Sequence, residues 1–461
     1  MAAASARLST VVQANTYPLA VASAIFAIAV AIPAHDADAY WQLATGRWMP
    51  AHGELLRQDV FSSTVAGAHL FTGEWLGQLA FAAAFTSGGW VGAVALRALL
   101  VATGAFFMVR LARRGGVSWL ISLPVALIAL AVSTTAWVDR PLTFTIAFVP
   151  LLLDLLFAAP TGFSLRLALV PPLFALWANL HEGYLLGLFI VAVFAAHALL
   201  VDGRRGIALA ITTIVAGAAS LINPSPLEIG AALDALLRGP RFLDEFRPAD
   251  VLKGAGVPFA AMLLLVLASA LLRGGGPRDA MLLLPLLYLA FTAQRQMTFF
   301  AIAAVPFVAP RLDSLQPFGH LPELPRALRL PLALGLAVVA LGSLPLAASV
   351  DERSFPAGAL AVVRGDRGVL LNEYEWGGYL ILDLPERPVF IDGRYAPYVP
   401  AVFDDYHAMV GLRSGWKDLL AKYRVDELLL RPSRPLAVAL REEGWRVRAE
   451  EPEQWVVLSR P

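Results

Sequence analysis

The chain has 461 residues, of which 58% are hydrophobic and only 15% are charged, and its mean hydropathy is +0.66. These values exclude an ordinary soluble globule and indicate a polytopic membrane protein. A net charge of +1 without a basic stripe argues against a nucleic-acid partner. The absence of cysteine excludes disulfides and thiol catalysis, and the seven histidines lack zinc-ligand spacing.

The first membrane span is predicted at 17–33, an uncharged apolar run long enough to cross a bilayer. No convincing Ala-x-Ala cleavage site accompanies it, so we expect a retained helix and not a removed signal peptide. A short apolar segment at 76–85 predicts an amphipathic helix on the membrane surface. Further apolar windows lie at 90–109, 117–138, 141–158, 165–180, 184–201, 206–222, 257–272, 279–293, 297–310 and 327–349. Together these windows predict about eleven spans, with a break at Gln294-Arg295-Gln296.

The arginines predict the orientation of these spans, because they mark alternate connections that the positive-inside rule places in the cytoplasm. The arginines in question are Arg110, Arg113, Arg114, Arg204, Arg205, Arg273, Arg278, Arg311, Arg326 and Arg329. The outward connections then contain Asp36, Asp38, Asp139, Arg140, Asn179, His181, Glu182, Asn223, Asp244, Glu245 and Arg295. The residues that could perform chemistry therefore gather on the outer face of the cytoplasmic (inner) membrane.

The first outward loop, 34–89, is the strongest candidate for a catalytic segment, because a plain connection does not need so many polar and aromatic residues. It opens with Asp36 and Asp38, a pair that suits a divalent cation such as Mg²⁺ or Mn²⁺, a general base, or both. The alternative is a solvated pair that ends the preceding helix. Glu74 is either a further carboxylate of the site or an acid favoured by a helix N-terminus.

Residues 350–461 form a second region, with alternating strand and helix signals and no membrane window. Strands are predicted at 369–371, 389–391, 427–430 and 455–458, and helices at 402–412, 416–423 and 435–443. We therefore predict a mainly α transmembrane domain over 1–349 and a small extracytoplasmic α/β domain over 350–461. This second domain has no dinucleotide, Walker or hydrolase motif, so we expect no organic cofactor.

This layout resembles the GT-C glycosyltransferases, polytopic enzymes that use polyprenyl-phosphate-linked sugars. In the first loop, the residues from Asp36 to Gly46, then Asp59-x-Phe61-Ser62 and Glu74-Trp75-Leu76, are similar to those of a group of bacterial members. The segment around Trp376 and Tyr379 resembles the Trp-Trp-Asp-Tyr-Gly region of the oligosaccharyltransferase catalytic subunit, which holds the acceptor peptide. Here glycine replaces that family's acidic residue and the spacing is one residue shorter, which argues against recognition of a peptide sequon.

The resemblance implies a GT-C-like helical bundle, a polyprenyl-phosphate sugar donor in the bilayer, and a glycan, lipid or protein acceptor. It makes Asp36 the first candidate base or metal ligand and Asp38 its partner, with Glu74 as a further catalytic candidate. Candidate substrate-binding residues are Arg140, His181, Glu182, Asp244, Glu245, Arg295, Trp376 and Tyr379. Of these, the two arginines suit phosphate because a guanidinium offers two hydrogen bonds in one plane.

Several of these residues also have a structural interpretation. Arg140 has the alternative of a local pair with Asp139, and Arg295 that of an anchor at a helix end. The pair His181-Glu182 could equally be a polar helix terminus. Asp244 and Glu245 lie in a long loop, 223–256, of the kind that closes over a donor in GT-C enzymes.

Two other functions compete with glycosyl transfer. A transporter or flippase for a lipid-linked intermediate is disfavoured, because the predicted spans hold few ionisable residues, chiefly Arg97 and Asp154. A non-catalytic scaffold that keeps the fold is compatible with the sequence, since fold does not imply function.

Overall fold

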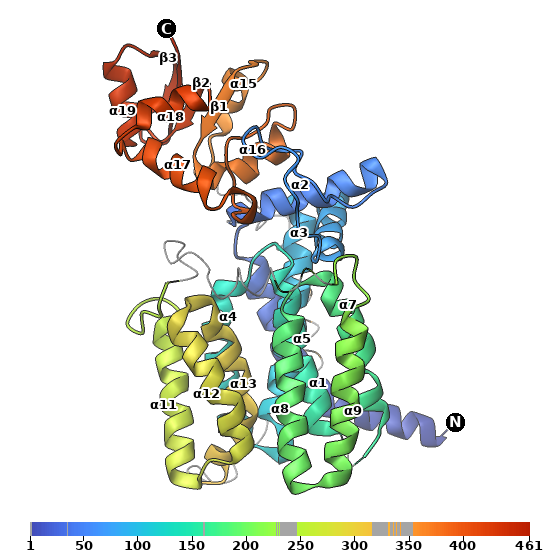
Figure 1. Cartoon of the computed structure of the whole chain (residues 1–461). Coiled ribbons are helices and arrows are strands. Elements are labelled where there is room, and N and C mark those ends of the chain that lie inside the picture. Colours follow the sequence, from blue (N-terminus) through green and yellow to red (C-terminus); the bar gives the residue numbers. More distant parts are fainter. Residues whose placement is uncertain are drawn as a thin grey trace. The chain divides into compact units, whose positions relative to one another are not determined.

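We analysed a computed structural model of the chain (Figure 1). The structure describes all residues except 1, 35, 160–161, 227, 229, 231–246, 316–330, 332–334, 336–337, 339–341 and 343–353. Its contacts divide the chain into two compact units. Unit 1 comprises Met1–Ile32 and Ala93–Ala348, and unit 2 comprises Pro33–Gly92 and Ser349–Pro461. The first loop of the chain therefore groups with the C-terminal region, a grouping that the sequence did not suggest.

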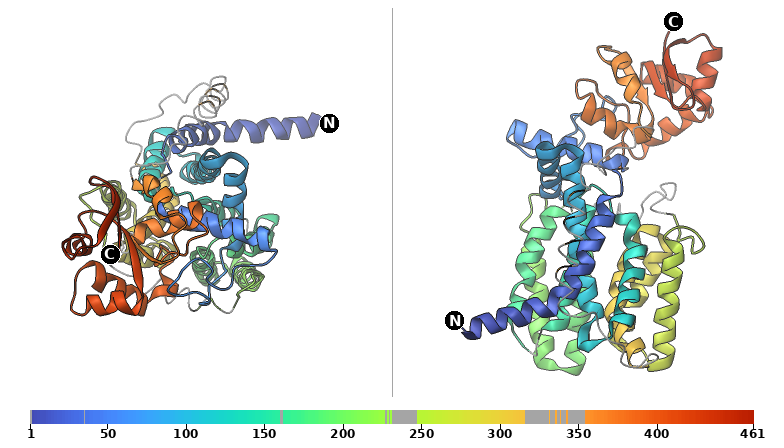
Figure 2. Two further views of the ribbon diagram at one scale, coloured as in Figure 1. Left: turned by 90° about the horizontal axis from the view of Figure 1, so that it is seen from above. Right: turned by 180° about the vertical axis from the view of Figure 1, so that it is seen from behind.

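Unit 1 is helical throughout its described elements, and Figure 2 gives two further views of them. It contains α1 (Ala2–Val30), the second part of α3 (Trp75–Ala112), α4 (Trp119–Ser133), α5 (Leu142–Ala158), α6 (Leu165–Ala168), α7 (Val170–Leu180), α8 (Tyr184–Val201), α9 (Gly203–Ser220), α11 (Gly256–Arg273), α12 (Pro277–Thr292) and α13 (Met297–Asp313). Short 3-10 helices lie at Arg114–Gly116, Thr134–Ala136 and Gln294–Gln296. The last of these separates α12 from α13 at the predicted break.

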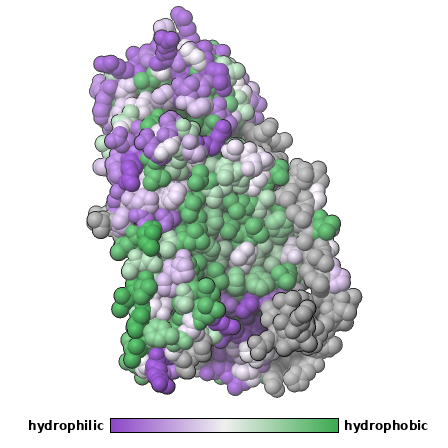
Figure 3. All heavy atoms as spheres, turned by 90° about the vertical axis from the view of Figure 1, so that its right-hand side faces the viewer, coloured by the Kyte–Doolittle hydropathy of each residue, from purple (hydrophilic) through white to green (hydrophobic). Residues whose placement is uncertain are grey.

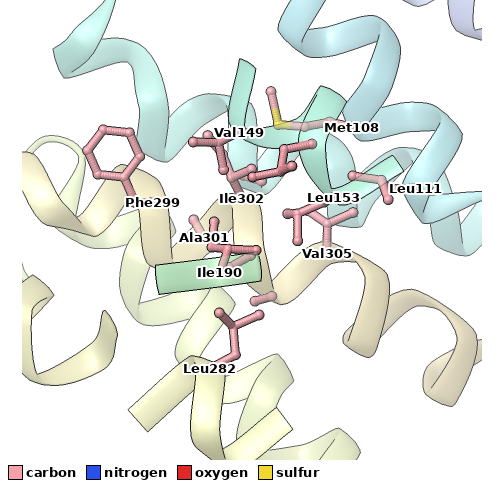
Figure 4. Close-up of a cluster of buried hydrophobic side chains, with 14 of the residues drawn as sticks. Met108, Leu111, Val149, Leu153, Ile190, Leu282, Phe299, Ala301, Ile302 and Val305 are labelled. Carbon is pink, nitrogen blue, oxygen red and sulfur yellow. The ribbon is translucent and has the colours of Figure 1, made fainter. Parts of the chain in front are cut away.

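Helix α13 lies at the centre of unit 1. Every residue from Met297 to Ala309 is buried, which fits a helix that is apolar on all sides. Its side chains pack against those of α3, α5, α8 and α12, as the cluster in Figure 4 shows. At the surface of unit 1 many large aliphatic residues are instead exposed, and hydrophobic residues dominate broad areas in Figure 3. Exposed apolar residues on helices of this kind are expected where the surrounding solvent is lipid.

The chain is a multi-pass membrane protein, but the predicted count of eleven spans is not established. Among the described residues, four helices are long and apolar enough to cross a bilayer: Trp75–Ala112, Trp119–Ala136, Tyr184–Val201 and Gly256–Arg273. Shorter apolar helices occur at Asn15–Val30, Leu142–Ala158 and Leu165–Leu180. The predicted span at 327–349 lies almost entirely outside the described residues.

Unit 2 begins with α2 (Ala37–His52) and the first part of α3. Helix α3 is broken at Gly88 and Gly89, where Gly89 adopts a positive φ of 58° that glycine accepts readily. The chain folds back so closely that a Cβ on Gly92 would lie 2.0 Å from the carbonyl oxygen of Ala84. The predicted short helix at 76–85 is therefore present as the part of α3 before this break.

The C-terminal part of unit 2 is a four-stranded sheet with helices packed against it. The strands are β1 (Val369–Asn372), β2 (Val425–Leu430), β3 (Arg446–Glu451) and β4 (Trp455–Ser459), in the order β1-β2-β4-β3. Strands β1 and β2 are parallel, and the other pairs are antiparallel. The helices are α15 (Leu360–Val363), α16 (Gly377–Asp383), α17 (Ala401–Val410), α18 (Trp416–Lys422) and α19 (Pro435–Glu442), with 3-10 helices at Ala357–Ala359, Tyr374–Trp376 and Ala396–Tyr398.

The strand predicted at 389–391 is wrong, although all three residues are fully buried. Val389 forms only an isolated bridge, and its partner is Ser62 of the first loop. The backbone N–H of Phe390 donates instead to the side chain of Asn372 at 2.8 Å, and the amide of Asn372 donates to the Ile391 carbonyl at 2.8 Å. A side chain thus supplies the hydrogen bonds that a neighbouring strand would otherwise make.

Candidate functional site

Asp36 and Asp38 lie at the start of α2. Asp36 is the N-cap residue, and its Oδ1 accepts a hydrogen bond from the backbone N–H of Asp38 at 3.0 Å. Asp38 lies in the first turn, where its Oδ1 accepts from the indole Nε1–H of Trp41 at 3.1 Å. Both side chains are half-buried. Two carboxylates are thus held at the N-terminus of one helix by donors from that same helix.

Two glycines from the C-terminal region pack directly against this turn. A Cβ on Gly393 would lie 2.0 Å from Oδ1 of Asp38, and a Cβ on Gly378 would lie 2.8 Å from the carbonyl oxygen of Ala37. A larger residue at position 378 would meet the backbone of this turn, and one at position 393 would displace the carboxylate of Asp38. The segments around Asp36 and around Trp376, which are more than three hundred residues apart in sequence, therefore meet within unit 2.

A buried ionic network fastens the first loop to the same region. Arg394 donates from Nε and Nη2 to Asp392 at 2.8 and 2.6 Å, and it also bonds Asp59 in the first loop. All three side chains are at most 5% exposed. Burial opposes the charge of Arg394, but Asp392 and Asp59 together raise its pKa well above the ordinary value. Such a pair of carboxylates on one guanidinium is a fixed structural junction.

Neighbouring residues of the first loop strengthen this junction. Asp59 also accepts hydrogen bonds from the backbone N–H and the hydroxyl of Ser62, while the ring of Phe61 lies 5.3 Å from the Arg394 guanidinium carbon. The backbone N–H of Val389 donates to the Phe61 carbonyl at 2.9 Å. The Asp59-x-Phe61-Ser62 motif therefore attaches the loop to the C-terminal region.

The structure places the other predicted residues of unit 2 around α2. Glu74 accepts from Nε2 of Gln42 at 3.2 Å, and Gln42 lies one helical turn after Asp38 on the same face. Tyr379 is buried in an aromatic cluster, with its ring centroid 5.3 Å from that of Tyr40. Trp376 is also buried and donates to the Ser354 carbonyl at 3.0 Å. Packing accounts for both aromatic residues, and their role in substrate binding remains a prediction.

Unit 1 contains a second group of predicted residues, formed by Arg140, His181 and Arg295. They come from three different connections between helices. Burial, together with the positive charges of Arg140 and Arg295, lowers the pKa of His181 to about 3, so both arginines act electrostatically on this ring. The imidazole is therefore neutral at physiological pH, and the local positive charge belongs to the two arginines.

Hydrogen bonds fix the tautomer of His181. The backbone N–H of Gly183 donates to Nδ1 at 2.9 Å, so Nδ1 carries no proton and the hydrogen of the neutral ring is on Nε2. The hydroxyl of Thr145 lies 2.9 Å from the same Nδ1 and accepts from the Trp177 indole at 3.1 Å. The buried Trp177 thus orients Thr145. Thr145 and Gly183 together hold the His181 ring with its Nε2–H as the donor.

This environment predicts a pH dependence of stability. Below pH 6.5 the unfolded chain binds a proton at His181 that the folded chain does not bind until about pH 3, so stability falls as the pH decreases through this window. At pH 5 the loss should be about 2 kcal/mol. We expect His181→Asn, whose amide oxygen can replace Nδ1 as an acceptor, to lose less melting temperature than the wild type between pH 7 and pH 5. Equal losses in detergent-solubilised samples would contradict this assignment.

Two ion pairs join ionisable residues that are buried or half-buried in the described part of unit 1. Arg97 and Asp139 are both fully buried and lie 2.7 Å apart, and Arg97 also donates to the Ala29 carbonyl at the end of α1 at 2.9 Å. Asp139 therefore pairs with Arg97, whereas the sequence had offered it as a partner of Arg140. Asp154 binds Arg110 at 3.1 Å. These pairs neutralise charges within the helices and stabilise their packing.

The remaining predicted residues lie beside the group in unit 1 or outside the described chain. Glu182 is the half-buried neighbour of His181 in the turn between α7 and α8. Asp244 and Glu245 lie outside the described residues. The described end of their loop contacts the Arg295 turn, because the backbone N–H of Gln294 donates to the Arg247 carbonyl at 2.9 Å.

Asp36 and Asp38 remain the candidate metal ligands. Among the described residues there is no group of three or more histidines or carboxylates that could hold an ion. A pair of carboxylates nevertheless suits Mg²⁺, which keeps several waters and commonly takes further oxygens from a substrate phosphate. The carboxylates of Asp36 and Asp38 therefore suit an ion that also binds the substrate. They are too few for a metal centre with protein ligands alone.

Sequence reasoning missed three residues that organise unit 2, namely Asp392, Gly393 and Arg394. The sequence signals were their position directly after the buried segment 389–391 and the place of Asp392 at the end of the segment that resembles the oligosaccharyltransferase region. Their partners lie in the first loop, so local patterns could not reveal the contact.

Two solved protein structures have folds similar to this one. No family model matches the chain, and no curated protein sequence matches it. ArnT from Cupriavidus metallidurans, solved bound to undecaprenyl phosphate, aligns with 96% of this chain and 97% of its own, with a TM-score of 0.54 and 13% identity.

A second similar fold is that of the archaeal oligosaccharyltransferase AglB from Archaeoglobus fulgidus. Its apo form aligns with 90% of this chain and 69% of its own, with a TM-score of 0.57 and 11% identity. Its complex with an inhibitory peptide and a dolichol-phosphate covers the same shares, with a TM-score of 0.54 and 13% identity. Both ArnT and AglB are GT-C glycosyltransferases. This chain therefore has a GT-C-like fold, as its first loop and its layout had predicted.

Proposed function

We propose that this protein is a membrane glycosyltransferase that moves a sugar from a polyprenyl-phosphate-linked donor to an acceptor at the outer face of the cytoplasmic membrane. The observation that supports this most strongly is that the positive charges of Arg140 and Arg295 both act on His181, whose ring stays neutral in unit 1. Two cations beside a neutral N–H donor suit a phosphate. The fold adds support, since structures of ArnT and AglB contain undecaprenyl phosphate and dolichol-phosphate respectively.

In the proposed reaction the acceptor hydroxyl attacks the anomeric carbon of the donor sugar. Its proton passes to Asp36, a new carbon–oxygen bond forms, and the bond between the sugar and the phosphate oxygen breaks. The polyprenyl phosphate leaves with the electron pair, and preorganised positive charge stabilises the negative charge that grows on it. A divalent cation held by Asp36 and Asp38 would supply further charge stabilisation when bound.

The same proposal orients the protein. If the arginine-rich connections lie in the cytoplasm, the sheet of unit 2 lies outside. We expect a single cysteine introduced at Ser433 in this cysteine-free chain to react with an impermeant maleimide in intact spheroplasts. Reaction only after lysis would place unit 2 in the cytoplasm and would contradict an outward-facing reaction.

Arg295 provides the sharpest test of phosphate binding. Arg295→Lys keeps the charge but loses the planar pair of donors, so affinity for undecaprenyl phosphate should fall about ten-fold, and Arg295→Ala should bind more weakly still. Melting temperature should remain close to that of the wild type, because the side chain is half-buried at a helix connection. Binding by the purified chain can be followed by native mass spectrometry. Unchanged affinity in both variants would reduce Arg295 to a helix anchor.

A transporter is a weaker second candidate. Its translocation path would need ionisable groups within the helices, and the pairs Arg97–Asp139 and Arg110–Asp154 are already joined to one another. Release of free polyprenyl phosphate on mixing the purified protein with lipid-linked sugar and acceptor would support transfer. Movement of the intact lipid-linked sugar across a vesicle membrane, without that release, would support transport.

A further inference from the structure

Three arginines converge on the C-terminal end of α5. The last turn of a helix leaves carbonyl groups without partners inside the helix and carries a partial negative charge. In α5 three consecutive carbonyls, those of Leu156, Phe157 and Ala158, accept hydrogen bonds from arginine side chains. The donors are Arg205 of α9 at 3.2 Å, Arg114 of the 3-10 helix Arg114–Gly116, and Arg166 of α6 at 2.8 Å.

A fourth arginine, Arg278, lies against the same helix end. Its guanidinium carbon is 4.8, 5.3 and 5.2 Å from the ring centroids of Phe157, Phe194 and Phe307. Its side chain is 27% exposed, and its Nε lies 3.9 Å from Oδ1 of Asp279, too far for a hydrogen bond, so the buried Nε–H has no hydrogen-bond acceptor among the described residues. Aromatic faces attract the charge of this arginine but provide no oxygen for its N–H groups.

The positive charge of this arginine group exceeds the negative charge around it. Asp154 and Asp279 are the carboxylates nearest to Arg114 and Arg278, and they already bind Arg110 and Arg311. Burial lowers the pKa of Arg114, and although Asp154 opposes this effect, the charges of Arg166, Arg205 and Arg278 add to it. Half-buried like charges repel one another unless an anion accompanies them.

The surroundings indicate what kind of anion this is. Large aliphatic side chains next to the group are strongly exposed: Leu165, beside Arg166, is 79% exposed, and Leu200, at the end of α8 before Arg205, is also 79% exposed. Such side chains suit lipid chains and do not suit bulk water. Basic groups between membrane helices commonly hold acidic lipid headgroups.

We propose that Arg114, Arg166, Arg205 and Arg278 form a binding site for the phosphate headgroup of an anionic phospholipid. The guanidinium groups donate paired hydrogen bonds to the phosphate oxygens, and the three phenylalanine rings form the apolar floor beneath Arg278. The acyl chains lie along the exposed aliphatic residues of unit 1. This site uses none of the residues assigned to glycosyl transfer, so its test is independent of that function.

The experiment compares Arg278→Gln with the matched variant Arg204→Gln, measured on the full chain in a neutral detergent. Arg204 belongs to the same set of connections but is exposed, so its replacement causes the same change in net charge. Phosphatidylglycerol binding is measured by native mass spectrometry, with phosphatidylcholine as the zwitterionic reference. We expect the wild type to prefer phosphatidylglycerol, Arg278→Gln to bind it about five-fold more weakly, and Arg204→Gln to match the wild type.

Two further measurements use the wild type alone, so they test the proposal even if Arg278→Gln fails to fold. They follow lipid binding in added salt and in added inorganic phosphate. Phosphatidylglycerol binding by the wild type should weaken in 0.5 M salt, which is about three times the physiological ionic strength. Millimolar inorganic phosphate should not displace the lipid. Equal affinity for the two lipids, equal binding by both variants, or displacement of the lipid by inorganic phosphate would each overturn the proposal.

Discussion

Asp36→Asn should lower sugar transfer by about 100-fold or more while leaving the melting temperature unchanged. Asparagine is as good an N-cap residue as aspartate, and its side-chain oxygen can still accept from the N–H of Asp38. The substitution therefore removes the negative charge and the basicity at the start of α2 while keeping the helix cap. The measurement is transfer from a polyprenyl-phosphate sugar by detergent-purified protein, with thermal melting followed in parallel.

Asp38→Asn serves as the companion variant. If Asp38 orients Asp36 or shares an ion with it, transfer should fall less than in Asp36→Asn, and raised Mn²⁺ should recover part of the loss. Full activity in both variants would remove the pair from the mechanism. Parallel losses of activity and melting temperature would mean that the carboxylates support only the fold of α2.

Arg394→Met should destabilise unit 2 by about 3–5 kcal/mol, because it leaves Asp59 and Asp392 as buried, uncompensated charges. Asp59 and Asp392 have no exposed side-chain surface, and burial of an unpaired carboxylate is costly. Adding Asp59→Asn to this variant should recover part of the stability by removing one of the two charges. Thermal melting together with limited trypsin digestion of the C-terminal region measures both effects.

The control is Arg431→Met, which breaks the ion pair with Glu375. In that pair the side chains are 45% and 59% exposed, so the change should cost no more than about 1 kcal/mol. Comparable destabilisation by the two substitutions would show that Arg394 does not fasten the first loop to the C-terminal region.

The sequence alone predicted many of the helices of unit 1 and the strands β1, β2 and β4 of unit 2. Long uncharged runs predict membrane helices because backbone groups in a bilayer must bond within the helix. The separation of α12 from α13 followed from three polar residues at 294–296. The sequence also singled out Asp36 and Asp38 directly after an apolar run, although it predicted a loop where the structure has α2. These features are encoded locally, by residue type and spacing, so reading along the chain was sufficient.

Only the tertiary structure decided which distant residues meet. Asp59 and Arg394 are 335 positions apart, and Gly393 closes on Asp38 across a similar interval. The buried segment 389–391 has the pattern of a strand. Its backbone instead pairs with Ser62 of the first loop and donates to the Asn372 side chain. Likewise, Arg114 and Arg205, which the sequence placed on separate cytoplasmic connections, converge with Arg166 on one end of α5. A buried charge or backbone group must be satisfied somewhere, but its partner depends on long-range folding, which local periodicity does not encode.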